Sequence, residues 1–369
     1  MMVHARCIPL LTLFAGCAAL EGPAPTAPIA GSVPVDHLIQ PGEKHFAHLW
    51  QLTNGGENAE AYWSFGGDRL VFQKRDPEVG IECDRIFVTG ADAETTQVSN
   101  GRGATTCAFF LPGDGAVLFS STHSHHEQCP PPPDRSQGYV WILHPQYDIY
   151  VQDLEGGQPR TLVGGWGYDA EATVSPIGDQ IVFTSTRSGD VELWTCDIDG
   201  SNQRQVTDAP GYDGGAFHSH DGTRLIFRST VFTPGAEEEE LADYRRLLAQ
   251  WMVRPLRMEI MVVDVDGTNR AQVTSLGKAN FAPYFFPDDS RVIFATNHHD
   301  QRRPALGFDL FAVDLDGEHL EQITFYDEGR GKQFDSFPMF SPDGRYLAFS
   351  SNRGSGPSGD TNVFIAEWR

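Results

Sequence analysis

The stretch that decides the fold is Phe340-Ser341-Pro342-Asp343-Gly344-Arg345-Tyr346-Leu347-Ala348-Phe349-Ser350-Ser351-Asn352-Arg353. A short apolar run leads into a turn rich in Asp, Gly and Pro, and an alternating apolar strand follows, which is the pattern of a β-hairpin. The same pattern returns five more times, and these copies start at Trp63, Phe110, Val174, Phe217 and Phe285. The chain is therefore built from six copies of one unit.

Each complete unit has two further strands. A third strand such as Glu192–Ile198 follows the hairpin, and an Asp-Gly or Glu-Gly turn leads into a short outer strand. These outer strands end in related sequences, at 205–207, 272–274 and 322–324. Four antiparallel strands that repeat every roughly 40 to 65 residues predict the blades of a β-propeller.

The sixth unit has only three strands and ends with Asn362–Trp368. Its missing strand occurs ahead of the first unit, at roughly His45 to Thr53, where Gln51-Leu52-Thr53 matches the outer-strand sequence. We expect this N-terminal strand to pair with the third strand of the last blade, because the pairing closes the ring and covers an open sheet edge. The prediction is an all-β fold, a closed six-bladed propeller over residues 44–369.

Composition excludes one class of partner. The chain has 369 residues, of which 27 are Lys or Arg and 50 are Asp or Glu, so its formal net charge is −23. Nucleic acid is an unsuitable partner, because phosphate binding needs a basic surface. No run approaches the 18 apolar residues of a membrane-spanning helix.

The N-terminal residues 1–16 read as a signal peptide. Ala15-Gly16-Cys17 resembles a bacterial lipobox, which implies lipidation of Cys17 and makes the lipid the only membrane attachment. An ordinary signal peptide, a cytosolic chain and a secreted soluble protein are the alternatives. Four prolines in residues 21–34 indicate an extended tether, which we assign to 17–43. We expect a periplasmic or outer-membrane-anchored protein.

Export makes disulfides permissible. Cys83, Cys107 and Cys129 fall in neighbouring parts of the first two blades, and we expect two of the three to pair, without a choice between them. Cys196 alternates with apolar residues in a strand and is predicted to be a buried thiol.

The phrase Phe-Ser-Pro-Asp-Gly, followed by an apolar strand, Ser-Asn-Arg and Asp-x-Asp-Gly, resembles the repeat of TolB-type β-propellers, which is similar to WD-repeat blades. The resemblance covers about Lys44 to Arg369. It implies the fold and leaves the activity open. TolB carries an extra α/β domain ahead of its propeller, and here only the predicted tether precedes it.

Long insertions are predicted on one face. The loop between the second and third strands spans 122–147 in blade two and 231–257 in blade four, but only 186–190 in blade three. In a propeller these loops share a face, so we expect a binding surface there. The blade-four insertion should contain a helix within Ala236–Trp251, with an apolar stripe of Leu241, Tyr244, Leu248 and Trp251. This helix either caps the propeller or docks a partner.

The blade-two insertion contains the chain's one candidate metal site. His123, His125 and Glu127 lie within five residues, and such side chains bind Zn²⁺ or another divalent cation. Their spacing matches no closed zinc site, so a polar loop stiffened by prolines is the simpler interpretation. We expect no cofactor, with a divalent metal as the alternative.

Further candidate binding residues are predicted at the mouth of the central channel, on the long-loop face. Basic side chains end the second strands, at Arg75, Arg187, Arg228, His298 and Arg353. Acidic or amide side chains begin the inner strands, at Glu60, Asp169, Glu171, Asp213, Asn280 and Asp335. The structural interpretation is salt bridges between blades; the functional one is a polar mouth that binds a ligand, with His123, Tyr139 and Trp141 nearby.

Two functions remain open. The first is a non-catalytic scaffold that binds an envelope protein or peptide, or a carbohydrate through Tyr139, Trp141, Trp166 and Tyr168. The second is a hydrolase or lyase with a metal-assisted site at the channel mouth. No Gly-x-Ser-x-Gly elbow, His-Glu-x-x-His motif or phosphate loop is present in the sequence, so we favour the binding module.

Overall fold

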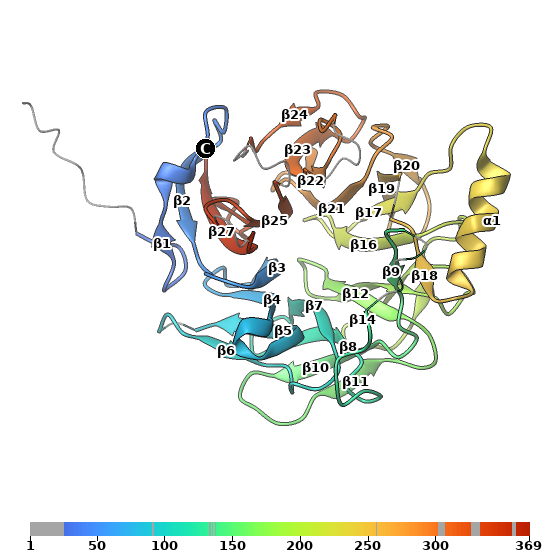
Figure 1. The fold of residues 1–369 in the computed structure, drawn as a ribbon, viewed down its shortest axis with the longest axis horizontal. Coiled ribbons are helices and arrows are strands. Elements are labelled where there is room, and N and C mark those ends of the chain that lie inside the picture. Colours follow the sequence, from blue (N-terminus) through green and yellow to red (C-terminus); the bar gives the residue numbers. More distant parts are fainter. Residues whose placement is uncertain are drawn as a thin grey trace, which may run out of the picture.

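Six four-stranded antiparallel blades surround a central axis, and consecutive blades follow one another around the ring (Figure 1). The computed structural model describes residues 26–90, 92–132, 134, 136, 138–255, 257–301, 307–325, 333–355 and 359–369. The predicted six-bladed all-β fold with one inserted helix is confirmed.

The first three blades follow the predicted order of strands. Blade one contains β3 (Glu57–Trp63), β4 (Leu70–Asp76), β5 (Ile81–Thr89) and β6 (Thr95–Gln97), with the short 3-10 helix η2 (Pro77–Val79). Blade two contains β7 (Thr105–Phe110), β8 (Ala116–Ser121), β10 (Asp148–Asp153) and β11 (Arg160–Val163). Blade three contains β12 (Asp169–Val174), β13 (Gln180–Ser185), β14 (Glu192–Asp197) and β15 (Arg204–Gln205).

The last three blades repeat that order. Blade four contains β16 (Asp213–His218), β17 (Arg224–Thr230), β19 (Met258–Asp264) and β20 (Ala271–Gln272). Blade five contains β21 (Asn280–Phe285), β22 (Arg291–Thr296), β23 (Asp309–Asp314) and β24 (Glu321–Gln322). Blade six contains β25 (Asp335–Phe340), β26 (Tyr346–Ser351) and β27 (Asn362–Trp368) from the C-terminus.

The N-terminal segment completes blade six, as predicted. Strand β2 (Phe46–Gln51) pairs antiparallel with β27, and Trp50 lies opposite Ile365. Figure 1 shows this N-terminal strand beside the C-terminal one. The pairing joins the two ends of the chain through one sheet, so the last blade is finished only when the N-terminal strand is in place.

The propeller begins earlier in the chain than residue 44. Strand β1 (Val33–Pro34) pairs with β2 and adds a fifth strand to blade six, and the 3-10 helix η1 (Asp36–Leu38) follows it. Ile29 is buried in the core. The part of the predicted tether from Ile29 onward therefore packs on the propeller instead of extending from it. Cys17 and the predicted signal peptide lie outside the described residues.

Aromatic side chains close the centre of the ring. Tyr62, Phe109, Phe217 and Tyr284 come from the inner strands of blades one, two, four and five. The Tyr62 ring lies 5.3 Å from the Phe217 ring, which in turn lies 5.3 Å from the Tyr284 ring. Because side chains from opposite blades touch, the channel is blocked at this level, and the space above it opens toward the long-loop face.

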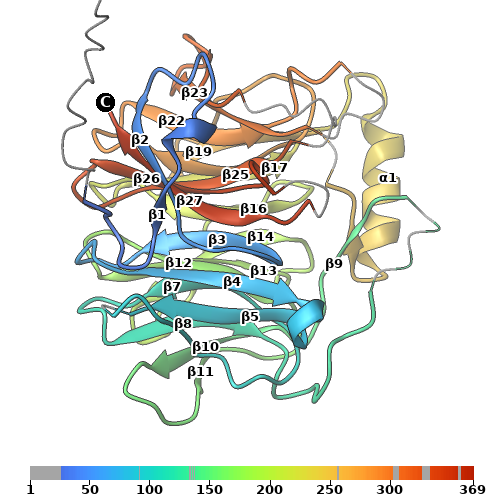
Figure 2. The same ribbon diagram turned by 60° about the vertical axis from the view of Figure 1, so that its left-hand side comes forward.

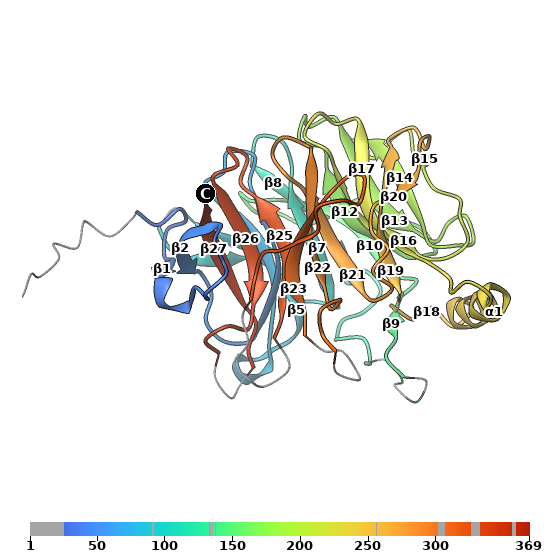
Figure 3. The same cartoon turned by 90° about the horizontal axis from the view of Figure 1, so that it is seen from above.

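The two long insertions join each other on that face. Strand β9 (Trp141–Ile142) of the blade-two insertion pairs with β18 (Met252–Val253) of the blade-four insertion. Helix α1 (Glu237–Leu248) lies beside this ribbon at the rim of the ring (Figures 2 and 3). Leu241, Tyr244 and Leu248 of the predicted stripe pack on the propeller, so the helix does cap it.

A disulfide between Cys83 and Cys129 fastens the blade-two insertion to blade one. This pair is one of those the sequence allowed; Cys107 is left as a free thiol, and Cys196 is a buried one, as predicted. No helix within the described ranges is long and apolar enough to cross a membrane.

Candidate functional site at the channel mouth

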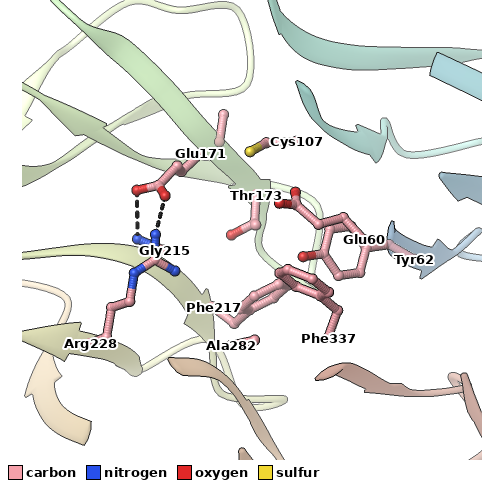
Figure 4. Close-up of a pocket in the computed structure, with 11 residues that line it drawn as sticks. Glu60, Tyr62, Cys107, Glu171, Thr173, Gly215, Phe217, Arg228, Ala282 and Phe337 are labelled. Carbon is pink, nitrogen blue, oxygen red and sulfur yellow. Dashed lines mark hydrogen bonds and ion pairs between the residues drawn. The ribbon is translucent and has the colours of Figure 1, made fainter. Parts of the chain in front are cut away.

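One residue of each inner strand bulges into the channel with a positive φ. These six residues are Glu60, Cys107, Glu171, Gly215, Ala282 and Phe337, with φ between 51° and 62°. The strand register shifts at each of them, which marks a β-bulge. Figure 4 shows that they converge on one space, which is polar where blades one to four meet and apolar at blades five and six.

Glu171 is the best-bound side chain of this ring. Its carboxylate forms an ion pair with Arg228 of β17, and it accepts hydrogen bonds from the Tyr212 hydroxyl at 2.6 Å and the Gly215 N–H at 3.0 Å. Thr184 Oγ1 donates a further bond at 2.7 Å. The pair links blades three and four, and its hydrogen bonds compensate the cost of burying two charges.

Arg228 is held from above by aromatic rings. Its guanidinium lies 5.2 Å from the ring centre of Trp141 and 5.3 Å from that of Tyr212. Trp141 reaches this position because β9 carries the blade-two insertion across the face to β18. A cation placed over indole and phenol faces is stabilised there, so Arg228 is fixed in place rather than free to follow a ligand.

Glu60 faces the Glu171–Arg228 pair from blade one. Its pKa is raised to about 7: burial is the largest cause and the charge of Glu171 adds to it, while a hydrogen bond with Cys107 and the charge of Arg228 oppose the rise. Burial and the two carboxylates also raise the pKa of the Cys107 thiol well above its usual value, so this thiol stays protonated. Near neutral pH the channel therefore contains one carboxyl group that exchanges a proton.

The space between these side chains is small. The cavity bounded by the bulge residues, Tyr62, Phe217 and Arg228 has a volume of about 30 Å³. That volume accommodates roughly two water molecules, and it is far below the 300 Å³ or more of typical organic-ligand pockets. A larger ligand must therefore bind above the cavity, at the mouth.

Partly buried aromatic rings form an arc around that mouth. The arc consists of Trp141, Phe281, Phe308, Phe334 and Phe337. Neighbouring rings lie 4.8 to 6.3 Å apart, and all five side chains are only partly buried. Blades two, five and six contribute to it, so the arc exists only in the closed ring.

The structure places some of the predicted mouth residues at the site and others elsewhere. Arg228 and Trp141 belong to the site described above. Arg187 instead pairs with Asp169 at 2.8 Å inside blade three. Arg353 and Asp335 lie 3.1 Å apart and are fully buried in blade six. The prediction that these charges form salt bridges is right, but most of the bridges lie within a blade and not between blades.

Four further predicted residues, of which His123 is described below, do not line the channel cavity. Arg75 pairs with Glu57 at 3.0 Å on a partly exposed edge of blade one. Tyr139 is 57% exposed, and its hydroxyl accepts a hydrogen bond from Trp141. His298 follows β22, and its backbone N–H donates to Thr296.

The three predicted metal ligands are not brought together. His123 is buried with its ring 4.1 Å from that of Tyr150, whereas His125 lies 3.8 Å from Asp148. Glu127 forms an ion pair with Arg102. Among the residues that the structure describes, no three His, Cys, Asp or Glu side chains converge as a metal site would require.

Sequence reasoning missed the bulge ring as a set, although a signal for it exists. When the six inner strands are aligned, the residue after each bulge is Ala or Pro: Ala61, Ala108, Ala172, Ala216, Pro283 and Pro338. Ala or Pro at this position of each aligned inner strand therefore marks the bulge. The arc of phenylalanines has no such signal, because Phe is frequent throughout the chain.

Solved structures share the fold at low sequence identity. A TolB-like protein from Agrobacterium tumefaciens matches with a TM-score of 0.51 at 16% identity, covering 85% of this chain and 91% of that one. TolB from Acinetobacter baumannii matches with a TM-score of 0.53 at 16% sequence identity, and the match covers 82% of this chain and 65% of that one. A gluconolactonase from Xanthomonas campestris matches with a TM-score of 0.54 at 14% sequence identity, and the match covers 92% of this chain and 97% of that one.

These values establish a common fold and nothing finer. The structural similarity to TolB agrees with the resemblance seen in the repeat. No family model matches the chain, and no curated protein matches it. An enzyme and TolB proteins both occur among the similar structures, so the fold leaves the activity open.

Proposed function

We propose that this protein is a non-catalytic binding module of the bacterial cell envelope. It is exported, anchored by a lipid on Cys17, and holds an envelope protein or peptide on its long-loop face. The observation that carries the proposal is the arc of partly buried aromatic rings, from Trp141 to Phe337, at the channel mouth. Aromatic side chains supply much of the binding energy at protein interfaces.

The interior of the site supports binding rather than turnover. Glu171 and Arg228 are bound to each other and to Tyr212, which leaves them few hydrogen-bonding positions for a substrate. The cavity beneath the arc is too small for a substrate of several heavy atoms. A partner therefore needs only to cover the mouth, with one side chain directed toward Arg228 and Glu60.

The test is capture of partners from an envelope extract of the organism that makes the protein. Wild-type protein is compared with a Phe308→Ser/Phe334→Ser variant, and Ile177→Ser is the matched control, since Ile177 is 61% exposed on the opposite face. We expect one partner that is retained by wild type and control and lost by the double variant. A partner retained equally by all three contradicts the proposal.

A second candidate function is favoured by Glu60 alone. A carboxyl group with a pKa of about 7 is suited to transfer protons at neutral pH, as a hydrolase or lyase would need. The similarity in fold to a gluconolactonase is compatible with this candidate. Turnover of a polysaccharide, lactone or peptide that disappears in Glu60→Gln would establish it in place of the binding module.

A further inference from the structure

A second concave surface lies at the rim of the propeller, away from the channel. It is a groove of about 370 Å³ between the end of α1 and the short blade-three loop, lined by Thr186, Gly189, Arg245, Leu248, Ala249 and Trp251. We call it the rim groove. Its volume lies within the range of pockets that hold small ligands or short peptide segments.

Trp251 lines the rim groove, and a second indole ring, that of Trp166, lies against it. Trp166, from the loop between blades two and three, is 74% exposed, and its ring stands at 90° to that of Trp251 at 6.2 Å. Trp251 lies three residues after the end of α1 and has a φ of 58°, a conformation that costs a bulky residue about 1 kcal/mol or more. The two rings stabilise each other edge to face, and most of Trp166 stays exposed for a ligand.

Arg245 is the one charged side chain among the residues that line the rim groove, in a chain with a net charge of −23. Arg245 is exposed and has no ion pair or side-chain hydrogen bond within the described part of the chain. Two nearby carboxylates have partners of their own. Asp190 accepts a hydrogen bond from the Tyr244 hydroxyl at 2.5 Å, and Asp243 forms an ion pair with Arg246.

We infer that the rim groove binds an acidic segment of a polypeptide that carries an aromatic or proline side chain. A carboxylate of the segment would pair with Arg245, and the ring would lie against Trp166 and Trp251 over the apolar side chain of Leu248. Trp and Arg are among the residues that dominate binding at protein interfaces, and the exposed guanidinium of Arg245 favours an acidic sequence.

Calorimetric titration of the mature protein with a synthetic peptide tests the inference. The peptide is acetyl-Asp-Glu-Phe-Pro-Glu-Asp-amide, and its control has lysine at each acidic position. We expect the acidic peptide to bind at least tenfold more tightly than the basic one. Arg245→Glu and Trp166→Ala should each weaken it tenfold or more, and both side chains are exposed, so both variants should fold.

Arg204→Glu is the matched control, because Arg204 is exposed on β15 and makes the same change in net charge. It should leave the affinity unchanged. Equal binding of the two peptides, equal losses in Arg204→Glu and Arg245→Glu, or tighter binding of a uronic acid oligosaccharide than of the peptide would each overturn the inference. The Phe308→Ser/Phe334→Ser variant should bind the peptide with unchanged affinity, and this result would distinguish the rim groove from the channel mouth.

Discussion

Gly215 is the position where one side chain decides whether the channel network forms. Its φ is +62°, and an added Cβ would overlap the guanidinium of Arg228. Its N–H also donates to Glu171. The missing side chain is therefore what allows Arg228 to cross from blade four to its carboxylate partner on blade three.

Gly215→Ala should lower the free energy of unfolding by roughly 3 kcal/mol, because it adds backbone strain and breaks a buried ion pair. Gly113→Ala is the control, since Gly113 has a φ of +84° but no neighbour near an added Cβ. The control should cost only about 1 kcal/mol. Urea denaturation measures both, and equal losses would contradict the role given to Gly215.

Glu60 should make stability depend on pH. Its pKa is about 7 in the folded protein and about 4.5 when unfolded, so the folded state binds the extra proton. Its contribution is fully present below the unfolded pKa and is lost as the pH rises through 7. Glu60→Gln carries no such charge, so its stability relative to wild type should increase between pH 5 and pH 8.

The increase should be on the order of 3 kcal/mol at most, since one pKa unit corresponds to 1.36 kcal/mol. Denaturant unfolding of both proteins at matched pH values gives the difference. Comparison with the variant isolates Glu60 from Asp84, whose pKa is also raised, to about 6. A difference that stays constant from pH 5 to pH 8 would show that Glu60 is ionised throughout.

At the scale of the element, the N-terminal segment is fixed by charge as well as by strand pairing. Glu43 lies just ahead of β2, and its carboxylate is 3.0 Å from Arg353, which also contacts Asp335. All three side chains are fully buried. The network fastens the segment that closes the ring to β25 and to the end of β26, the two strands of blade six that do not pair with β2.

Arg353→Met should destabilise the protein by about 3 to 5 kcal/mol, because two buried carboxylates lose their partner. Limited proteolysis should then cleave first ahead of residue 52. The control is Arg345→Met, whose pair with Glu367 is largely exposed and should matter little. Identical proteolysis patterns for the two variants would rule out this role for Arg353.

A short hydrogen bond joins helix α1 to blade three. The Tyr244 hydroxyl donates to Asp190 at 2.5 Å, beneath the rim groove. Tyr244→Phe should cost about 1 to 2 kcal/mol and speed hydrogen exchange within Glu237–Leu248. Tyr139→Phe, on an exposed side chain, is the control. Unchanged exchange in α1 would mean that apolar packing alone holds the helix.

At the scale of the whole molecule, the sequence predicts the structural features that repeat along the chain. Hairpin turns, outer strands and the orphan N-terminal strand follow from short local patterns, so the ring and its closure could be inferred. The contacts of Trp141 with Arg228 and of Trp166 with Trp251 could not be inferred, because each depends on where a long insertion lies on the propeller. The boundary of the tether was misplaced for a similar reason: Glu43 finds its partner 310 residues later.

The central claim is that the long-loop face at the channel mouth binds a partner, and site-specific photo-cross-linking in cells tests it most directly. A photoreactive amino acid replaces Phe308 in the aromatic arc or, separately, Ile177 on the opposite face. We predict that one distinct cross-linked species forms with the probe at 308 and none with the probe at 177. No adduct at 308, or the same adduct from both positions, would contradict the claim.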